Sequence, residues 1–145
     1  MAEAKKLYAL EPRPAGSDIV IANAFIKPNE SAIAVLVGLL GLDGLKGTVV
    51  IVANAPEGQV VHYLLGRFGR EYGGRQYPVS SIPGGANLIV QAPHYDRTFM
   101  DWFSNPEVVT WTRSWDETLE LLKPTHGPGS RVAVVPSATM AYYDG

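Results

Sequence analysis

Six side chains suited to ligand binding or proton transfer follow the apolar segments of this chain: Asn23, Lys27, Asn54, Glu57, His94 and Tyr95. A lysine cation and amide groups can hold a carboxylate or a hydroxyl, and a histidine titrates near neutral pH. Each residue comes just after a run that predicts a buried strand, and α/β proteins bind ligands at that end of their strands. The pattern predicts substrate binding by the first four residues and Tyr95, with His94 as a catalytic acid or base.

Each of these side chains also has a purely structural interpretation. Asn23 and Asn54 can close turns by hydrogen bonding to the nearby backbone. Glu57 can complement the dipole of a following helix, and a lysine on a loop is often only solvated. His94 can lie in solvent while Asp96 caps the next helix. The sequence leaves both interpretations open.

Five short apolar runs predict the strands that position these side chains. Each run is almost continuously apolar rather than alternating, which is typical of parallel strands buried on both faces. The runs are Asp18–Ala22, Thr48–Ala53, Asn87–Gln91, Glu107–Trp111 and Arg131–Val135. Helical patterns lie between them, over Ser31–Leu40, Gln59–Tyr72, Asp96–Phe103 and Ser114–Lys123.

The alternation of strands and helices predicts a doubly wound (Rossmann-like) α/β domain. We expect a three-layer αβα arrangement around a mostly parallel sheet of about five strands. Residues 1–16 predict a lead-in segment, and residues 17–145 predict a single α/β domain. The helix over Ser114–Lys123 should begin with a capping box, because Ser114 stands three residues before Glu117.

Composition narrows the classes of function. The formal net charge is −2, so the basic surface of a nucleic-acid-binding protein is not expected. The chain has no cysteine and its three histidines are widely spaced, so a metal site built by this chain alone is not expected. The sequence shows no signal peptide and no apolar run long enough to cross a bilayer. These observations predict a cytoplasmic protein without nucleic-acid or membrane partners.

The order of the motifs resembles the C-terminal domain of nickel-dependent lactate racemase and its relatives. In that family a similar strand ends in a turn with an aromatic residue and a proline, and the next strand ends in a small-residue loop with an acid and a glycine. The likeness spans Ser17–Pro136. The segments that carry it are Asp18–Phe25, Lys46–Gly58, Trp115–Leu122, His126–Gly129 and Arg131–Pro136.

The resemblance implies an α/β domain that closes over a substrate held by a larger N-terminal domain. In the family, that N-terminal domain carries the histidine bases and most contacts to a covalently attached nickel-pincer nucleotide, so this chain alone is expected to bind no cofactor. The resemblance also implies a glutamine and a lysine one turn apart on the helix after the first strand. The helix over Ser31–Leu40 has neither residue, so racemisation by this chain alone is not expected.

The residues and the resemblance support three hypotheses about function. The first is a lid or docking domain for an N-terminal catalytic domain, in the same or a separate chain, that acts on a small hydroxy acid or polyol acid. The second is a non-catalytic module that binds a ligand or forms a homo-oligomer through the apolar helix and the three tryptophans. The third is a small enzyme that uses His94 as an acid or base, with Asp96 or Glu57. The resemblance favours the first hypothesis.

Overall fold

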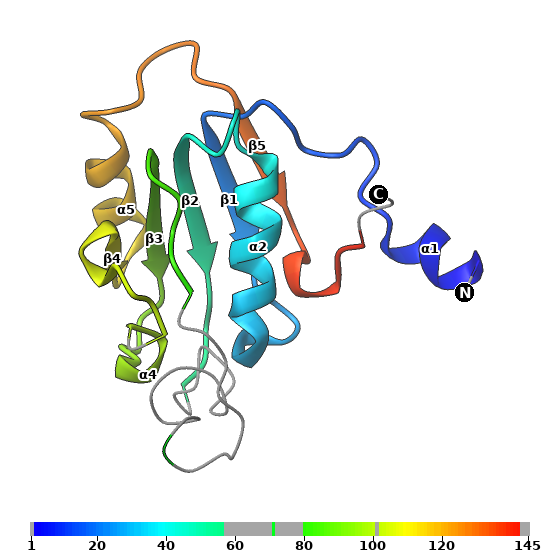
Figure 1. Ribbon diagram of the computed structural model, residues 1–145, viewed down its shortest axis with the longest axis horizontal. Helices are drawn as coiled ribbons and strands as arrows, with labels where there is room; N and C mark the ends of the chain where they lie inside the picture. Colours follow the sequence, from blue (N-terminus) through cyan, green and yellow to red (C-terminus); the bar gives the residue numbers. More distant parts are fainter. Residues whose placement is uncertain (1, 57–70, 72–79, 101, 143–145) are drawn as a thin grey trace.

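The computed structural model describes residues 2–56, 71, 80–100 and 102–142 of the 145-residue chain (Figure 1). At its centre lies a five-stranded, all-parallel sheet with the order β4-β3-β2-β1-β5. The predicted doubly wound α/β fold with about five strands is therefore confirmed. The strands are β1 (Ile19–Asn23), β2 (Gly47–Val52), β3 (Ala86–Gln91), β4 (Val109–Thr112) and β5 (Val132–Val135).

The central strands are apolar without alternation because both faces of the sheet are covered there. Val49, Val50 and Ile51 are consecutive residues of β2, their side chains alternate between the two faces, and all three are fully buried. A polar side chain at any of these positions would be buried without water, which explains the continuous run.

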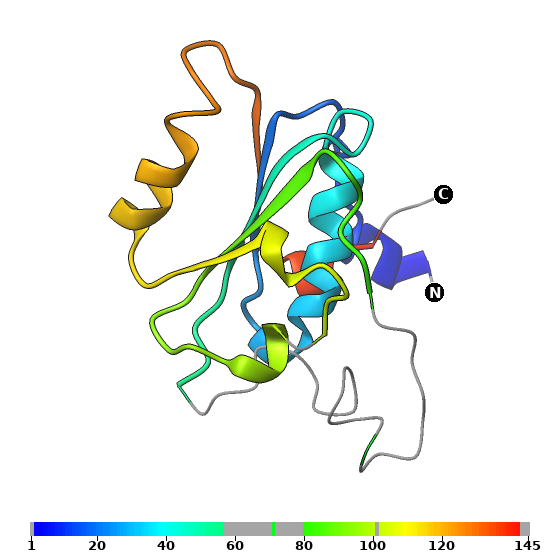
Figure 2. The same cartoon turned by 60° about the vertical axis from the view of Figure 1, so that its left-hand side comes forward.

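Helices lie on both faces of the sheet, as Figure 2 shows. The helix α2 (Ser31–Gly41) packs on β1 and β2, and its Val35 shares a core with Val20 and Val49. The helix α5 (Trp115–Leu122) covers the other face, where Leu122 packs with Val50. The remaining described helices are α1 (Ala2–Tyr8) and α4 (Arg97–Met100).

Two predicted elements differ from the structure. The fourth strand begins at Val109 rather than Glu107, because residues from Pro106 to Val108 form a 3₁₀ turn in which the Val108 N–H donates to the Asn105 carbonyl. The helix predicted over Asp96–Phe103 is only the short α4, because the chain beyond it leaves the helix and Phe103 forms a bridge with Ser80. Apart from Glu71, the helix predicted over Gln59–Tyr72 lies outside the described residues.

The predicted cap of α5 is present in a modified form. The Glu117 N–H donates to Ser114 Oγ at 3.2 Å, as in a capping box. The Glu117 carboxylate accepts its hydrogen bond from the N–H of Arg113, at 2.7 Å, rather than from that of Ser114. The helix start is therefore determined locally by these two side chains.

The lead-in segment carries the helix α1 and then joins the C-terminal segment. Ala9 forms a parallel bridge with Tyr142, and the Tyr142 N–H donates to the Tyr8 carbonyl at 2.8 Å. Figure 1 shows α1 at the β5 side of the sheet. Residues 1–16 are thus attached to the domain by the far end of the chain.

The helix α2 lies very close to the sheet at Gly38, which makes a stability test possible. A Cβ at Gly38 would lie 2.4 Å from Val49 Cγ1. We expect Gly38→Ala to lower the free energy of unfolding by about 1–3 kcal/mol, because overpacking outweighs the helix propensity gained. Urea denaturation measures the effect.

The matched control is Gly84→Ala, since a Cβ at Gly84 meets none of the described atoms within 4 Å. This control should change stability by less than about 0.5 kcal/mol. A Gly38→Ala protein that is as stable as the parent or more stable would contradict the close approach of α2 to β2.

Candidate functional site at the carboxyl edge of the sheet

The ends of four parallel strands form one edge of the sheet. Asn23 of β1 is in register with Val52 of β2, Val52 with Gln91 of β3, and Gln91 with Thr112 of β4. The loops that follow β1, β2 and β3 therefore leave the sheet next to one another. Every site residue predicted from the sequence and described by the structure either ends one of these three strands or follows it.

The end of β1 and the loop after it hold two of the predicted residues in different roles. Asn23 is half-buried, and its Oδ1 accepts a hydrogen bond from the Phe25 N–H at 3.1 Å. This bond closes the turn, which is the structural interpretation of Asn23. Lys27 is exposed, and its ammonium group makes no hydrogen bond or ion pair within the described part of the chain.

The loops after β2 and β3 present three more of the predicted residues. Asn54 and His94 are both exposed, and neither side chain has a polar partner among the described residues. Tyr95 is 54% exposed, and its ring meets that of Trp111 edge to face at 5.1 Å. Trp111 is itself held by a 2.8 Å hydrogen bond from its Nε1–H to the Ala92 carbonyl, so this loop rests on an ordered aromatic support.

Of the two proton-transfer partners predicted for His94, the structure describes only Asp96, which forms no hydrogen bond or ion pair with His94. Asp96 is 7% exposed and has an interaction of its own, whereas His94 lies in solvent. Glu57 lies outside the described residues. Within the described ranges, no three His, Asp or Glu side chains are grouped so that they could hold a metal ion. The described part of the edge thus offers a cation, an amide and an imidazole that are free to meet a ligand.

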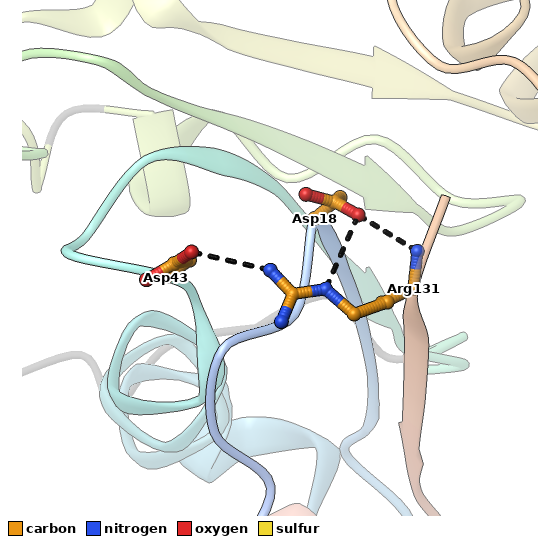
Figure 3. Close-up of polar contacts among 3 residues, drawn as sticks. All are labelled: Asp18, Asp43 and Arg131. Atoms are coloured by element: carbon orange, nitrogen blue, oxygen red, sulfur yellow. Dashed lines mark hydrogen bonds and ion pairs between the residues drawn. The ribbon is translucent and has the colours of Figure 1, made fainter. Parts of the chain in front are cut away.

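A second polar cluster lies at the opposite, amino edge of the sheet (Figure 3). Arg131 precedes β5, and its backbone N–H donates to Asp18 Oδ2 at 2.7 Å. The Arg131 guanidinium lies between two carboxylates, with Nη2 donating to Asp43 Oδ2 at 3.1 Å and Nε at 3.8 Å from Asp18 Oδ2. The Arg131 side chain is 61% exposed, so solvent screens these ion pairs and each contributes at most about 1 kcal/mol.

An open cavity of about 740 Å³ adjoins this cluster. Lys46 and His126 line it together with the two carboxylates. The His126 Nε2 lies 2.8 Å from Thr48 Oγ1, which ties the segment after α5 to the start of β2. Both carboxylates of this cavity contact Arg131, and His126 contacts Thr48, so the best-supported role of these contacts is to hold the starts of β1, β2 and β5 together.

The second cluster could not be predicted from the sequence, because its residues are far apart along the chain. Asp18 and Arg131 are 113 positions apart, and only the pairing of β1 with β5 brings them together. The sequence does place a charged residue directly before two of the strands, Asp18 before β1 and Arg131 before β5. The two residues can be recognised as neighbours only when the order of the strands in the sheet is known.

Fold and site together define the class of protein as a doubly wound α/β domain with polar loops at the carboxyl edge of its sheet. No protein-family model and no curated protein matches this chain. No helix in the described part of the chain has both the length and the apolar composition to span a bilayer.

Proposed function

We propose that this chain is a docking domain whose carboxyl edge closes over a small anionic ligand held by a larger partner domain. The observation that carries the proposal is the placement of Lys27, Asn54 and His94. The three exposed side chains stand on neighbouring loops and make no polar contact within the described part of the chain. Side chains kept free in this way are available to a ligand.

The chemistry of the three side chains suits a hydroxy acid. The Lys27 ammonium can pair with a carboxylate, and the Asn54 amide can donate to a carboxylate or accept from a hydroxyl. His94 can donate or accept at either ring nitrogen. Because all three are exposed, they cover a ligand from one side only, and the partner domain supplies the other side.

The proposal separates docking from catalysis. In the lactate-racemase family that the sequence resembles, the nickel-pincer nucleotide and the histidine bases belong to the N-terminal domain. The only polar side chain on α2 is that of Ser31, which is buried and donates to the Pro28 carbonyl at 2.6 Å. The α2 helix therefore supports the edge but adds no ligand-binding group, so we propose that the chain acts with a partner, in the cytoplasm, rather than as an isomerase alone.

The proposal is tested by titrating the ¹⁵N-labelled chain with sodium lactate at low ionic strength. We expect amide shift changes confined to the loops after β1, β2 and β3, with weak affinity because one wall of the site is missing. Lys27→Gln should raise the dissociation constant roughly threefold or more, because a charge-assisted hydrogen bond is lost.

The control variant is Lys46→Gln, since Lys46 is also an exposed lysine but lies beside the cavity at the amino edge. It should leave the titration unchanged. Shift changes centred on the amino-edge cavity, or a larger loss with Lys46→Gln than with Lys27→Gln, would contradict the proposal, and so would a lack of any shift at the carboxyl edge.

A further inference from the structure

The strand β5 lies at an edge of the sheet, where β1 is its one partner among the described strands. The Ile19 N–H donates to the Arg131 carbonyl. Because a parallel ladder alternates, the backbone groups of Ala133 also face β1, whereas the N–H and C=O groups of Val132 and Val134 point away from it. These outward groups have no hydrogen-bond partner among the described residues.

The edge formed by β5 lacks the features that normally prevent pairing with another strand. Edge strands usually carry a charge, a proline or a bulge for this purpose. All four residues of β5 are apolar, and they pair with β1 in continuous register without a bulge. Val132 and Val134 are 51% and 62% exposed, so apolar side chains lie next to the outward backbone groups.

A groove of about 430 Å³ runs beside β5, between residues 133–136 and the lead-in residues 10–15. Val134 is in register with Ile21, whose side chain packs on the α5 side of the sheet, whereas Ala133 packs with the core on the α2 side. Val134 therefore borders the groove at the edge of the strand, and the groove adjoins the outward backbone groups. The lining is mostly apolar, and its polar members are Glu11, Arg13 and Ser17.

We propose that an extended segment of a partner protein adds to the sheet at β5 and occupies this groove. The outward N–H and C=O groups recur at the spacing of a β ladder, and another extended backbone is the ligand that satisfies them together. Every second side chain of the added strand then lies on the α2 side, where the apolar lining of the groove suits a valine, leucine or isoleucine. The alternate side chains lie beside Val132 and Val134 on the other face.

The surroundings of β5 favour a single strand over a second copy of this chain. The helix α1 stands at the β5 side of the sheet (Figure 1), and the lead-in segment forms the outer wall of the groove. A second copy would have to bring its own sheet, α1 and lead-in segment into this space, whereas one extended segment needs only the width of a strand, about 4.8 Å.

The few groups involved set the expected strength of binding. Backbone hydrogen bonds from Val132 and Val134 and one apolar side chain in the groove predict a dissociation constant on the order of 100 μM. The groove includes none of Lys27, Asn54 and His94, so this inference and the docking proposal can fail independently.

NMR titration of the ¹⁵N-labelled chain with a defined peptide tests the inference. The probe is a blocked eight-residue peptide of alternating valine and threonine with a lysine at each end. The control peptide has prolines in place of the two central residues. We expect the probe to shift the amide signals of Val132, Val134 and the lead-in segment. The control peptide should bind at least about tenfold more weakly, because the prolines remove paired N–H groups from the added strand.

Val134→Pro tests the same edge from the side of the chain. It removes one outward N–H and keeps the hydrogen bonds between β5 and β1, because proline is tolerated at a strand edge where its nitrogen faces outward. It should weaken binding of the probe about tenfold or more. The matched control is Val134→Thr, which keeps the N–H and the β-branched shape and should bind the probe within about twofold of the parent.

Amide hydrogen exchange of the unmodified chain gives a second readout that needs no variant. In the dilute free chain, the amides of Val132 and Val134 should exchange at least about tenfold faster than that of Ala133, and the probe should slow them. Equal protection of the three amides in the free chain would show that the edge is already covered and would overturn the inference. Equal affinity for the two peptides, or probe shifts that avoid β5, would also overturn it. So would a dimer of the parent chain in sedimentation velocity that Val134→Pro disrupts, because the occupant would then be a second copy.

Discussion

Phe99→Ala is expected to lower the free energy of unfolding by about 3–5 kcal/mol, because a fully buried aromatic ring is removed and a cavity remains. Phe99 has no exposed surface. Its ring meets those of Phe103 at 5.2 Å, Trp111 at 6.1 Å and Trp102 at 6.2 Å, all in edge-to-face arrangements. Denaturant unfolding followed by tryptophan fluorescence measures the loss.

The control for this prediction is Phe25→Ala, the same substitution at a side chain that is 63% exposed. Measured on dilute protein, it should change stability by less than about 1 kcal/mol. Similar losses for the two variants would mean that Phe99 is not in the core. Because Trp111 supports both Phe99 and Tyr95, Phe99→Ala should also speed amide exchange in the loop of His94 and Tyr95.

Gly47→Ala is expected to cost about 3–5 kcal/mol of stability, through backbone strain and a clash together. Gly47 opens β2 with a φ of +122°, a conformation that side chains disfavour. A Cβ there would lie 2.3 Å from the carbonyl oxygen of Asp18, a backbone atom that is itself bonded to the Thr48 N–H. Neither partner can move without breaking the pairing of β1 with β2.

Thermal and denaturant unfolding measure this loss, with Gly127→Ala as the control. Gly127 has open space around it among the described atoms and no positive φ, so its replacement should be nearly neutral. A Gly47→Ala protein that unfolds at the same denaturant concentration as Gly127→Ala would contradict the backbone conformation at the start of β2. The amino-edge cluster should also loosen in Gly47→Ala, because Asp18 adjoins the clash.

The strands were predictable because their signal is local. A run of apolar residues without alternation indicates burial on both faces, and each of the five observed strands begins and ends within two residues of its prediction. The common edge for Asn23, Lys27, Asn54, His94 and Tyr95 follows from the same signal, since parallel strands all end at one side of a sheet. The sequence offered turn closure by Asn23 as one of two interpretations, and it did not reveal that Tyr95 would rest on Trp111.

Local sequence patterns were thus enough to predict the fold class, the strands and the edge at which the candidate ligand-binding residues gather. Two further features depend on contacts between segments far apart in the chain. The order of the strands places β5 beside β1 and so joins Arg131 to Asp18 and Asp43, a neighbourhood that no local pattern encodes. The uniformly apolar α2 carries no pattern to tell its inner side from its outer side. The sheet buries Gly38 and Val35 and leaves Leu36 in water, because one helix can press only one of its faces against the sheet.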